Sequence, residues 1–210
     1  MAIRAVIFDY GGVVCFHPTR EQIADAARLC DVSPEEFVRA LWKNRLTYDA
    51  GQPPFDYWRD VAVLMHRSFD DAMIQEMIRR EIDFWSRLDD RILAWIDRLR
   101  ANGLRTGILS NLPIPLGKQL RGNGLLKHFD HVTFSFELGC TKPDRRIYEH
   151  AIAGSGVAPA EALFLDDRPE NVKGALETGL VSELYTTWEA FASEVPRRHD
   201  LPLPAPPGGR

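Results

Sequence analysis

Cysteine is scarce in this chain, which has only three in 210 residues and no CxxC pair. An odd count without paired spacing argues against a framework of disulfide bonds. We therefore expect Cys15, Cys30 and Cys140 to be small packed residues rather than bridges or nucleophiles. A reducing compartment is the simplest setting for such a chain, so we expect a cytoplasmic protein.

Long hydrophobic runs and an excess of positive charge are also absent. No apolar run approaches the roughly 20 residues of a membrane span, and the N-terminal residues lack the pattern of a signal peptide. The formal net charge of −4 provides no overall basic field for nucleic acid or anionic membranes. We therefore expect neither nucleic acid nor a membrane as partner. The length favours a globular core domain that carries an insertion.

The stretch AVIFDYGGVV, residues 5–14, contains the clearest single signal. Its four apolar, β-prone residues predict a strand buried on both faces, as at the centre of a parallel sheet. The strand ends at Asp9, and Gly11 and Gly12 follow, which let a ligand approach the main chain closely. A carboxylate at such a strand end lies where open α/β sheets bind ligands.

Residues 17–88 have helical periodicity and no convincing strand. Ser33 with the Pro and Glu residues after it is typical of a helix start, and Thr19 begins another. We expect the aromatic residues of this segment to be core, namely Trp42, Phe55, Trp58 and Trp85. The polar residues that could face a ligand are Arg20, Lys43, Arg45 and Tyr48, and the sequence does not choose among them.

From Asp89 onward, short apolar strands alternate with helices, which predicts right-handed crossovers and a parallel sheet. We expect a three-layer α/β/α Rossmann-like fold with an inserted α-helical cap. Residues 1–16 and 89–195 form the predicted core, and residues 17–88 form the predicted cap. The Pro-rich tail, residues 196–210, is expected to be disordered because it cannot bury a core.

Three predicted strands end in polar residues, and a lysine precedes a later helix. Parallel strands end along one edge of a sheet, so we expect these side chains to meet in one crevice. They are Asp9, Ser110, Asn111, Lys142, Asp166 and Asp167. Three carboxylates in one place repel one another, and Mg²⁺, which prefers oxygen ligands, relieves that repulsion. A phosphate can then bind, and one carboxylate can attack its phosphorus.

Four segments resemble, in order, the motifs of the haloacid dehalogenase superfamily, most of whose members are phosphatases that act through an aspartyl-phosphate. FDYGGVV resembles the first motif, LSN the second, the Lys142-Pro143 pair the third and FLDDRPENV the fourth. Each motif is short, but four of them at these spacings are specific. The helical insertion resembles the family's small cap, which closes over the site and selects the substrate.

The resemblance implies a role for each matching residue. Asp9 attacks phosphorus and also binds Mg²⁺, while Lys142 neutralises the nucleophile and the phosphate. Asp167 is a direct metal ligand, whereas Asp166 acts through a metal-bound water or orients Lys142. The other implied contacts are the main-chain carbonyl of Gly11 on the metal, and Gly12, Ser110 and Asn111 on the phosphate.

One position departs from the family pattern, since Gly11 stands where its phosphatases usually have a second Asp. That Asp protonates the leaving group, and such catalysis contributes about 10² to 10⁴ in rate. In one interpretation, the chain is a phosphatase for substrates whose leaving group needs little protonation, such as sugar 1-phosphates or acyl phosphates. Alternatively, it is a weaker, broader phosphatase that uses water or another group, with His17 as a candidate.

Two further alternatives stay open. The chain is a non-catalytic metabolite-binding or regulatory module, or it is a 2-haloacid dehalogenase. The dehalogenase branch usually has Ser and Asn where Asp166 and Asp167 stand, so we disfavour it. We expect a Mg²⁺-dependent hydrolase of phosphate monoesters, acting on a small phosphorylated metabolite such as a sugar phosphate, as a monomer or homodimer.

Overall fold

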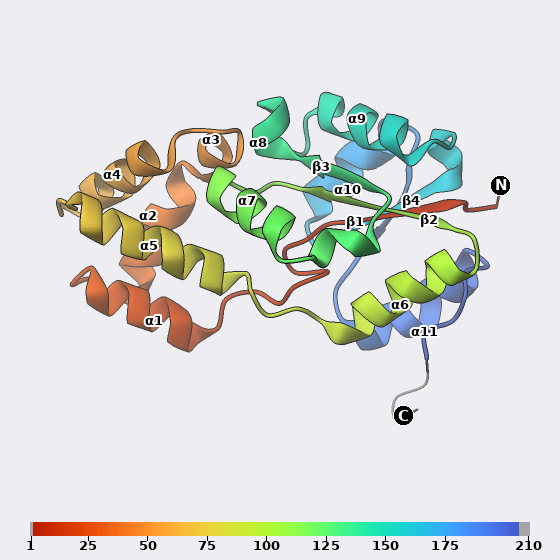
Figure 1. Cartoon of the computed structure of the whole chain (residues 1–210), viewed down its shortest axis with the longest axis horizontal. Helices are drawn as coiled ribbons and strands as arrows, with labels where there is room; N and C mark the ends of the chain where they lie inside the picture. The colour runs from red at the N-terminus through yellow and green to blue at the C-terminus, as the bar shows by residue number, and fades with distance from the viewer. Residues whose placement is uncertain (1, 206–210) are drawn as a thin grey trace.

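A five-stranded parallel sheet with helices on both faces forms the larger part of the molecule (Figure 1). The computed structural model describes residues 2–205. The strands lie in the order β3-β2-β1-β4-β5. They are β1 (Ala5–Phe8), β2 (Arg105–Ser110), β3 (His131–Phe134), β4 (Ala162–Asp166) and β5 (Val181–Leu184). The predicted α/β fold with three layers is confirmed.

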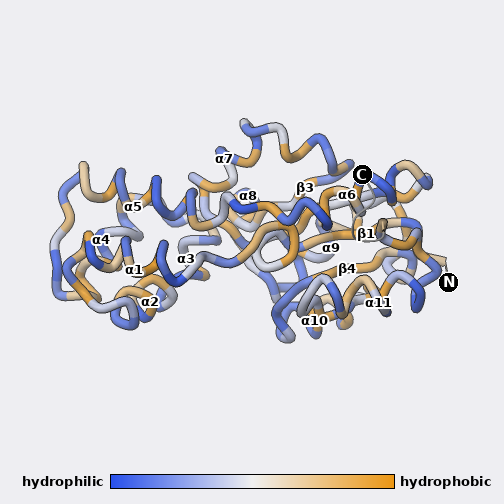
Figure 2. Tube along the Cα trace, turned by 90° about the horizontal axis from the view of Figure 1, so that it is seen from below, coloured by the Kyte–Doolittle hydropathy of each residue, from blue (hydrophilic) through white to orange (hydrophobic). Residues whose placement is uncertain are grey.

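The central strand β1 is buried on both faces because helices cover each side of the sheet. Val6 and Phe8 pack into one apolar cluster, whereas Ala5 and Ile7 pack into the opposite one. Helices α6 (Asp90–Ala101), α7 (Ile114–Gly122) and α11 (Trp188–Arg198) contribute to the first cluster, and α9 (Arg145–Ser155) and α10 (Pro169–Leu176) contribute to the second. Figure 2 shows apolar colour along β1 and β4.

Five helices between β1 and α6 form a separate bundle beside the sheet (Figure 1). They are α1 (Arg20–Leu29), α2 (Pro34–Lys43), α3 (Arg45–Asp49), α4 (Pro54–Leu64) and α5 (Asp71–Phe84). Side-chain caps at Thr19, Ser33 and Asp70 accept backbone N–H groups and define three of the helix starts. None of the helices in residues 2–205 has the length and apolarity needed to cross a membrane.

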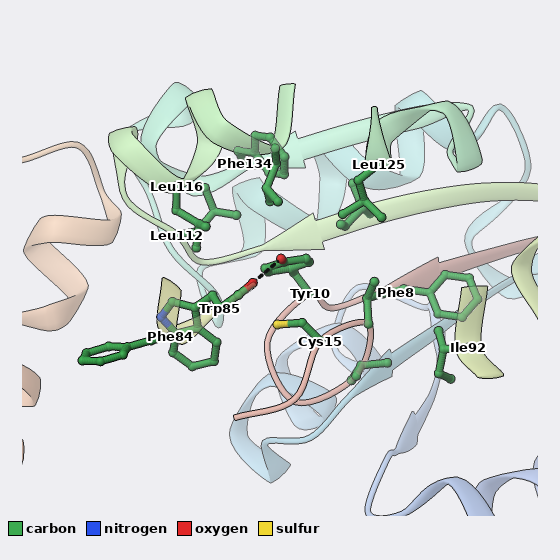
Figure 3. Packing of buried hydrophobic residues seen from close by; sticks show 14 of the residues in the cluster. Phe8, Tyr10, Cys15, Phe84, Trp85, Ile92, Leu112, Leu116, Leu125 and Phe134 are labelled. Carbon is green, nitrogen blue, oxygen red and sulfur yellow. Dashed lines mark hydrogen bonds between the residues drawn. The ribbon is translucent and has the colours of Figure 1, made fainter. Parts of the chain in front are cut away.

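Two chain segments that run antiparallel to each other, residues 14–17 and 85–89, form the crossings that join this bundle to the sheet. Phe16 N donates to Arg87 O at 2.8 Å, and Asp89 N donates to Val14 O at 2.9 Å. The Tyr10 hydroxyl, packed among core residues, donates to Trp85 O at 2.5 Å (Figure 3). These bonds fix the end of the bundle next to the C-terminal edge of β1.

The short helices of the loops complete the chain and add a third tie to the bundle. They are η1 (Leu125–His128), α8 (Ser135–Leu138) and η2 (Pro159–Glu161). At the start of α8, the Ser135 hydroxyl donates to Asp49 O at 2.5 Å and accepts from Leu112 N at 3.0 Å. Ser135 therefore connects the end of α3 to the loop that follows β2.

The prediction of a disordered tail is wrong for residues 196–202, which pack against the core. Helix α11 continues through Pro196, and Leu201 is only 6% exposed. The proline removes the N–H that would bond Ala192 O, but Arg197 Nη1 donates to that oxygen at 3.4 Å instead. Trp95 Nε1 also donates to Pro202 O at 2.7 Å, which fastens the segment to α6. The end of the predicted tail, residues 206–210, lies outside the described residues.

Candidate active site

Neighbouring strands of the sheet bring the predicted polar residues together. Asp9 follows β1, Ser110 ends β2 and Asp166 ends β4. Because β2 and β4 flank β1, these three ends lie side by side at one edge. Lys142, from the loop before α9, reaches the same place. The convergence expected from parallel strands is therefore what the fold produces.

The Lys142 ammonium lies at the centre of this arrangement, with its side chain 1% exposed. Its Nζ is 2.9 Å from Asp9 Oδ1 and 2.6 Å from Asp166 Oδ2, and it donates to Leu109 O at 3.2 Å. All three N–H groups are thus engaged. Burial favours the neutral amine, but the two carboxylates outweigh it and raise the pKa of Lys142 above its ordinary value. The two carboxylates therefore favour the charged form of Lys142.

Negative charge nevertheless exceeds positive charge at this point. Carboxylate oxygens of Asp9, Asp166 and Asp167 lie within 4.8 Å of one another. Burial, together with the charges of Asp166 and Asp167, raises the pKa of Asp9 to about 7 despite Lys142. An acidic set with this repulsion fits a hard divalent cation, whose charge would favour the ionised carboxylates.

The two acids of the fourth motif have different surroundings. Asp166 is fully buried and accepts hydrogen bonds from Asn171 Nδ2 and from Arg168 N, in addition to Lys142. Asp167 is 19% exposed, and its Oδ2 lies 3.0 Å from His17 Nε2. Asp166 is therefore held rigidly, whereas Asp167 presents a carboxylate toward the pocket.

Asn111 lines the pocket, but its side-chain amide is already engaged. Its Oδ1 accepts from Lys142 N at 2.7 Å, and its Nδ2 donates to Lys142 O at 3.0 Å. This pair of bonds clamps the main chain of Lys142. Ser110 is buried and also lines the pocket. Asn111 is thus built to position Lys142, and its contact with phosphate remains a prediction.

The two glycines after Asp9 differ in their surroundings. Gly12 has φ +78°, and a Cβ there would lie 2.5 Å from Asp167 Oδ2, so its lack of a side chain makes room for that carboxylate. Gly11 lines the pocket, and a Cβ on it would lie 3.1 Å from Cζ3 of Trp85. The indole thus lies against the position where the family's second Asp would begin. Gly12 is not among the pocket-lining residues of the described chain.

A cavity of about 520 Å³ opens above these residues and is shared between the sheet and the bundle. The bundle contributes Trp42, Arg45, Leu46 and Asp49, and the crossings contribute His17 and Trp85. The sequence interpretation of Trp42 as core is wrong, because its side chain is 45% exposed at this cavity. Asp49 was missed, although its i+4 spacing from Arg45 was a usable signal of a helical ion pair.

Of the four polar residues that the sequence offered as ligand-facing, the structure places one at the cavity. Arg45 lines the cavity, whereas Arg20 and Lys43 do not line it in residues 2–205. Tyr48 is fully buried behind Arg45, where its hydroxyl donates to Glu81 Oε2 at 3.0 Å. Glu81 was also missed, because nothing in its helical pattern distinguishes it from a solvated acid.

Comparison with known proteins identifies relatives in sequence and in fold. A mouse protein described as haloacid dehalogenase-like hydrolase domain-containing protein 3 is 31% identical, with 88% of this chain and 83% of the relative covered. The glyceraldehyde 3-phosphate phosphatase of Methanopyrus kandleri is 30% identical, with 86% and 82% covered. A HAD-family enzyme of Bacteroides thetaiotaomicron, crystallised with magnesium and inorganic phosphate, superposes with a TM-score of 0.72 at 21% identity, covering 90% and 99% of the two chains.

The family model of haloacid dehalogenase-like hydrolases matches residues 3–179, which include all four motif segments. That match spans most of the chain, and relatives at 30% identity or more cover it at similar breadth. The chain therefore belongs to the haloacid dehalogenase-like hydrolases.

Proposed function

We propose that this protein is a Mg²⁺-dependent phosphatase that hydrolyses phosphate monoesters of small metabolites through an aspartyl-phosphate on Asp9. The observation that carries the proposal is the Lys142 ammonium between Asp9 and Asp166, with Asp167 close by. The activity named for the Methanopyrus relative and the ligands of the Bacteroides enzyme support it. The unpaired, buried cysteines support a cytoplasmic setting.

Asp9, Asp167 and the main-chain carbonyl of Gly11 would hold the metal, with Asp166 behind them. Bound Mg²⁺ would neutralise the phosphate and part of the carboxylate charge. Lys142 favours the ionised form of Asp9 and orients it, and its positive charge attracts an approaching phosphate. Asn111 holds the main chain of Lys142, and Asp166 holds its ammonium group.

Asp9 supplies the electron pair for the first step. A carboxylate oxygen forms a bond to phosphorus while the bond from phosphorus to the ester oxygen breaks, and the alcohol leaves. Water then attacks the phosphorus of the acyl phosphate, which releases inorganic phosphate and regenerates Asp9.

The leaving alcohol needs a proton, and Gly11 cannot provide one. His17 is the titratable side chain of the cavity that lies next to Asp167 and above Gly12. We propose His17 or a bound water as the substitute, with best turnover on esters whose alcohol leaves easily. We also propose that α1–α5 act as the cap, since α3 contributes the wall opposite Asp9.

Substitution of the nucleophile tests the function directly. Asp9→Asn should abolish Mg²⁺-dependent release of p-nitrophenol from p-nitrophenyl phosphate, because an amide cannot form the acyl phosphate. Asp25→Asn, a surface change on α1 with the same chemistry, is the matched control and should retain turnover.

Two other outcomes would replace the proposal. Wild-type protein without turnover on p-nitrophenyl phosphate, acetyl phosphate and a sugar phosphate panel would favour a binding module. Release of chloride from 2-chloropropionate without metal would favour a dehalogenase. Either assay uses the intact chain and needs no variant.

A further inference from the structure

The wall of the cavity opposite Asp9 contains a buried charge cluster that the proposed phosphatase chemistry does not use. Arg45 has a side chain that is 7% exposed. Its Nε donates to Asp49 Oδ1 at 2.8 Å, and its Nη1 donates to Glu81 Oε1 at 2.5 Å. One guanidinium thus faces two carboxylates, and the hydroxyl of Tyr48 bonds the second oxygen of Glu81.

This cluster brings a donor residue and an acceptor residue to the cavity wall. Within residues 2–205, the hydrogen bonds of this cluster use Arg45 Nε and Nη1 and Asp49 Oδ1, not Arg45 Nη2 or Asp49 Oδ2. The Tyr57 hydroxyl also lies against the guanidinium. Arg45 and Asp49 both line the cavity and lie one helical turn apart, so a guanidinium and a carboxylate stand side by side in its wall. An alcohol hydroxyl matches this pair, because it donates and accepts at once.

The charges of the cavity disfavour a second anion besides the phosphate. Across the part of the chain that the structure describes, each basic side chain that lines the cavity already lies against a carboxylate. These pairs are His17 with Asp167, Arg45 with Asp49 and Glu81, Lys142 with Asp9 and Asp166, and Arg168 with Glu170. With all groups ionised, the Arg45 cluster sums to −1, and burial raises the pKa of both Asp49 and Glu81 despite Arg45. A carboxylate on the leaving group would meet no free cation there.

Apolar surface surrounds these polar atoms. Trp42 and Leu46 are 45% and 54% exposed at the entrance, and Trp85 and Leu116 continue the surface inward. Flat aromatic and aliphatic faces pack well against the C–H groups of a carbon skeleton.

We infer that the cap-side wall selects a leaving group that is uncharged and carries hydroxyl groups, and that it rejects one carrying a carboxylate or a second phosphate. The inference rests on the proposed phosphatase function. Arg45 and Asp49 are its specificity-determining residues, and Glu81 positions Arg45 and supplies the second negative charge.

A matched pair of esters tests this selection. Glycerol 3-phosphate and 3-phosphoglycerate share three carbons and differ by a hydroxymethyl group in place of a carboxylate. We expect kcat/KM with Mg²⁺ to favour glycerol 3-phosphate by about tenfold or more, as expected for a like charge near a partly buried one. Inhibition of p-nitrophenyl phosphate hydrolysis by each compound gives the same comparison as a ratio of Ki values.

Glu81→Gln removes one negative charge and keeps the shape of the side chain. It should shift the ratio toward 3-phosphoglycerate by about tenfold. Glu76→Gln, on the same helix but paired with Arg79 and Arg80 at the surface, should leave the ratio at its wild-type value. Asp49→Asn provides a second charge removal if Glu81→Gln does not fold.

The outcomes separate this inference from the function on which it rests. No turnover of p-nitrophenyl phosphate by the wild type would overturn the proposed function. Turnover with equal or better use of 3-phosphoglycerate, or with no inhibition by either three-carbon ester, would overturn the selection alone. So would a ratio that Glu81→Gln and Asp49→Asn both leave unchanged.

Discussion

Lys142 explains how several carboxylates coexist in a buried site. A buried ammonium is tolerated only when its charge and its N–H groups are satisfied, and Asp9, Asp166 and Leu109 O satisfy all three. Asn171 Nδ2 and Arg168 N in turn donate hydrogen bonds to the carboxylate of Asp166. Of the two acids that contact Lys142, Asp9 is the one that lines the pocket. Its contacts with Lys142 and with Tyr10 N both use Oδ1, which leaves Oδ2 for a nucleophilic role.

Gly11 is the residue at which the chain departs most from its family, and restoring the acid tests the consequence. Gly11→Asp should raise turnover of alkyl phosphates relative to p-nitrophenyl phosphate by about tenfold or more, because only poor leaving groups need a proton. A Cβ there would be 3.1 Å from the Trp85 ring, so the indole must shift by a few tenths of an ångström. The measurement is the ratio of kcat/KM values for the two esters.

The comparison is repeated in a Trp85→Leu background, where the ring no longer limits the space. Trp85→Leu alone is the control for changes in the cavity. A ratio that stays the same or falls in both backgrounds would contradict the role assigned to the missing acid.

At the scale of elements, the sheet was predictable because buried parallel strands are short apolar runs with polar residues at their ends. The same logic placed Asp9, Ser110, Lys142 and Asp166 in one crevice. The bundle was less predictable, since amphipathic periodicity shows which face of a helix is apolar but not what covers it. Trp42 and Trp58 look alike in sequence, yet one is 45% exposed at the cavity and the other is fully buried.

The helix α11 was missed for a different reason. A proline usually ends a helix, and Pro196 with the prolines after it indicated a disordered tail. The structure compensates through Arg197 and through apolar contacts of Leu201, which are tertiary effects that no local pattern reports.

Truncation of Leu201 measures how firmly the C-terminal segment is packed. Leu201→Ala should lower the free energy of unfolding by about 2 kcal/mol, because the side chain is nearly buried and leaves a cavity next to α6 and α11. Urea denaturation followed by tryptophan fluorescence provides the value. Leu203→Ala, at a side chain that is 42% exposed, should change it by less than about 0.5 kcal/mol. Equal effects of both changes would indicate that the segment does not pack as described.

For the whole molecule, the decisive feature is that one cavity takes its chemistry from the sheet and its walls from the bundle. Asp9 and Lys142 come from the core, whereas Arg45 and Asp49 come from α3. The two parts are held by the paired crossings and by the Ser135 bond to Asp49 O. In the proposed function, reaction type and substrate choice are thus carried by separate regions of one chain, so the motifs bear on the first and leave the second open.

Stability of the whole molecule should depend on Mg²⁺, because only the folded chain brings the three carboxylates together. Binding to the native state alone stabilises it by about 2.7 kcal/mol at a hundred times Kd, which corresponds to roughly 5–10 °C in Tm for a chain of this size. Asp167→Asn should lose this shift without lowering the metal-free Tm, since it also removes a repelling charge. Asp56→Asn, an exposed change on α4, should keep the wild-type shift. Calorimetry with Mg²⁺ and with EDTA provides the test, and a full shift in Asp167→Asn or none in the wild type would exclude these carboxylates as the metal site.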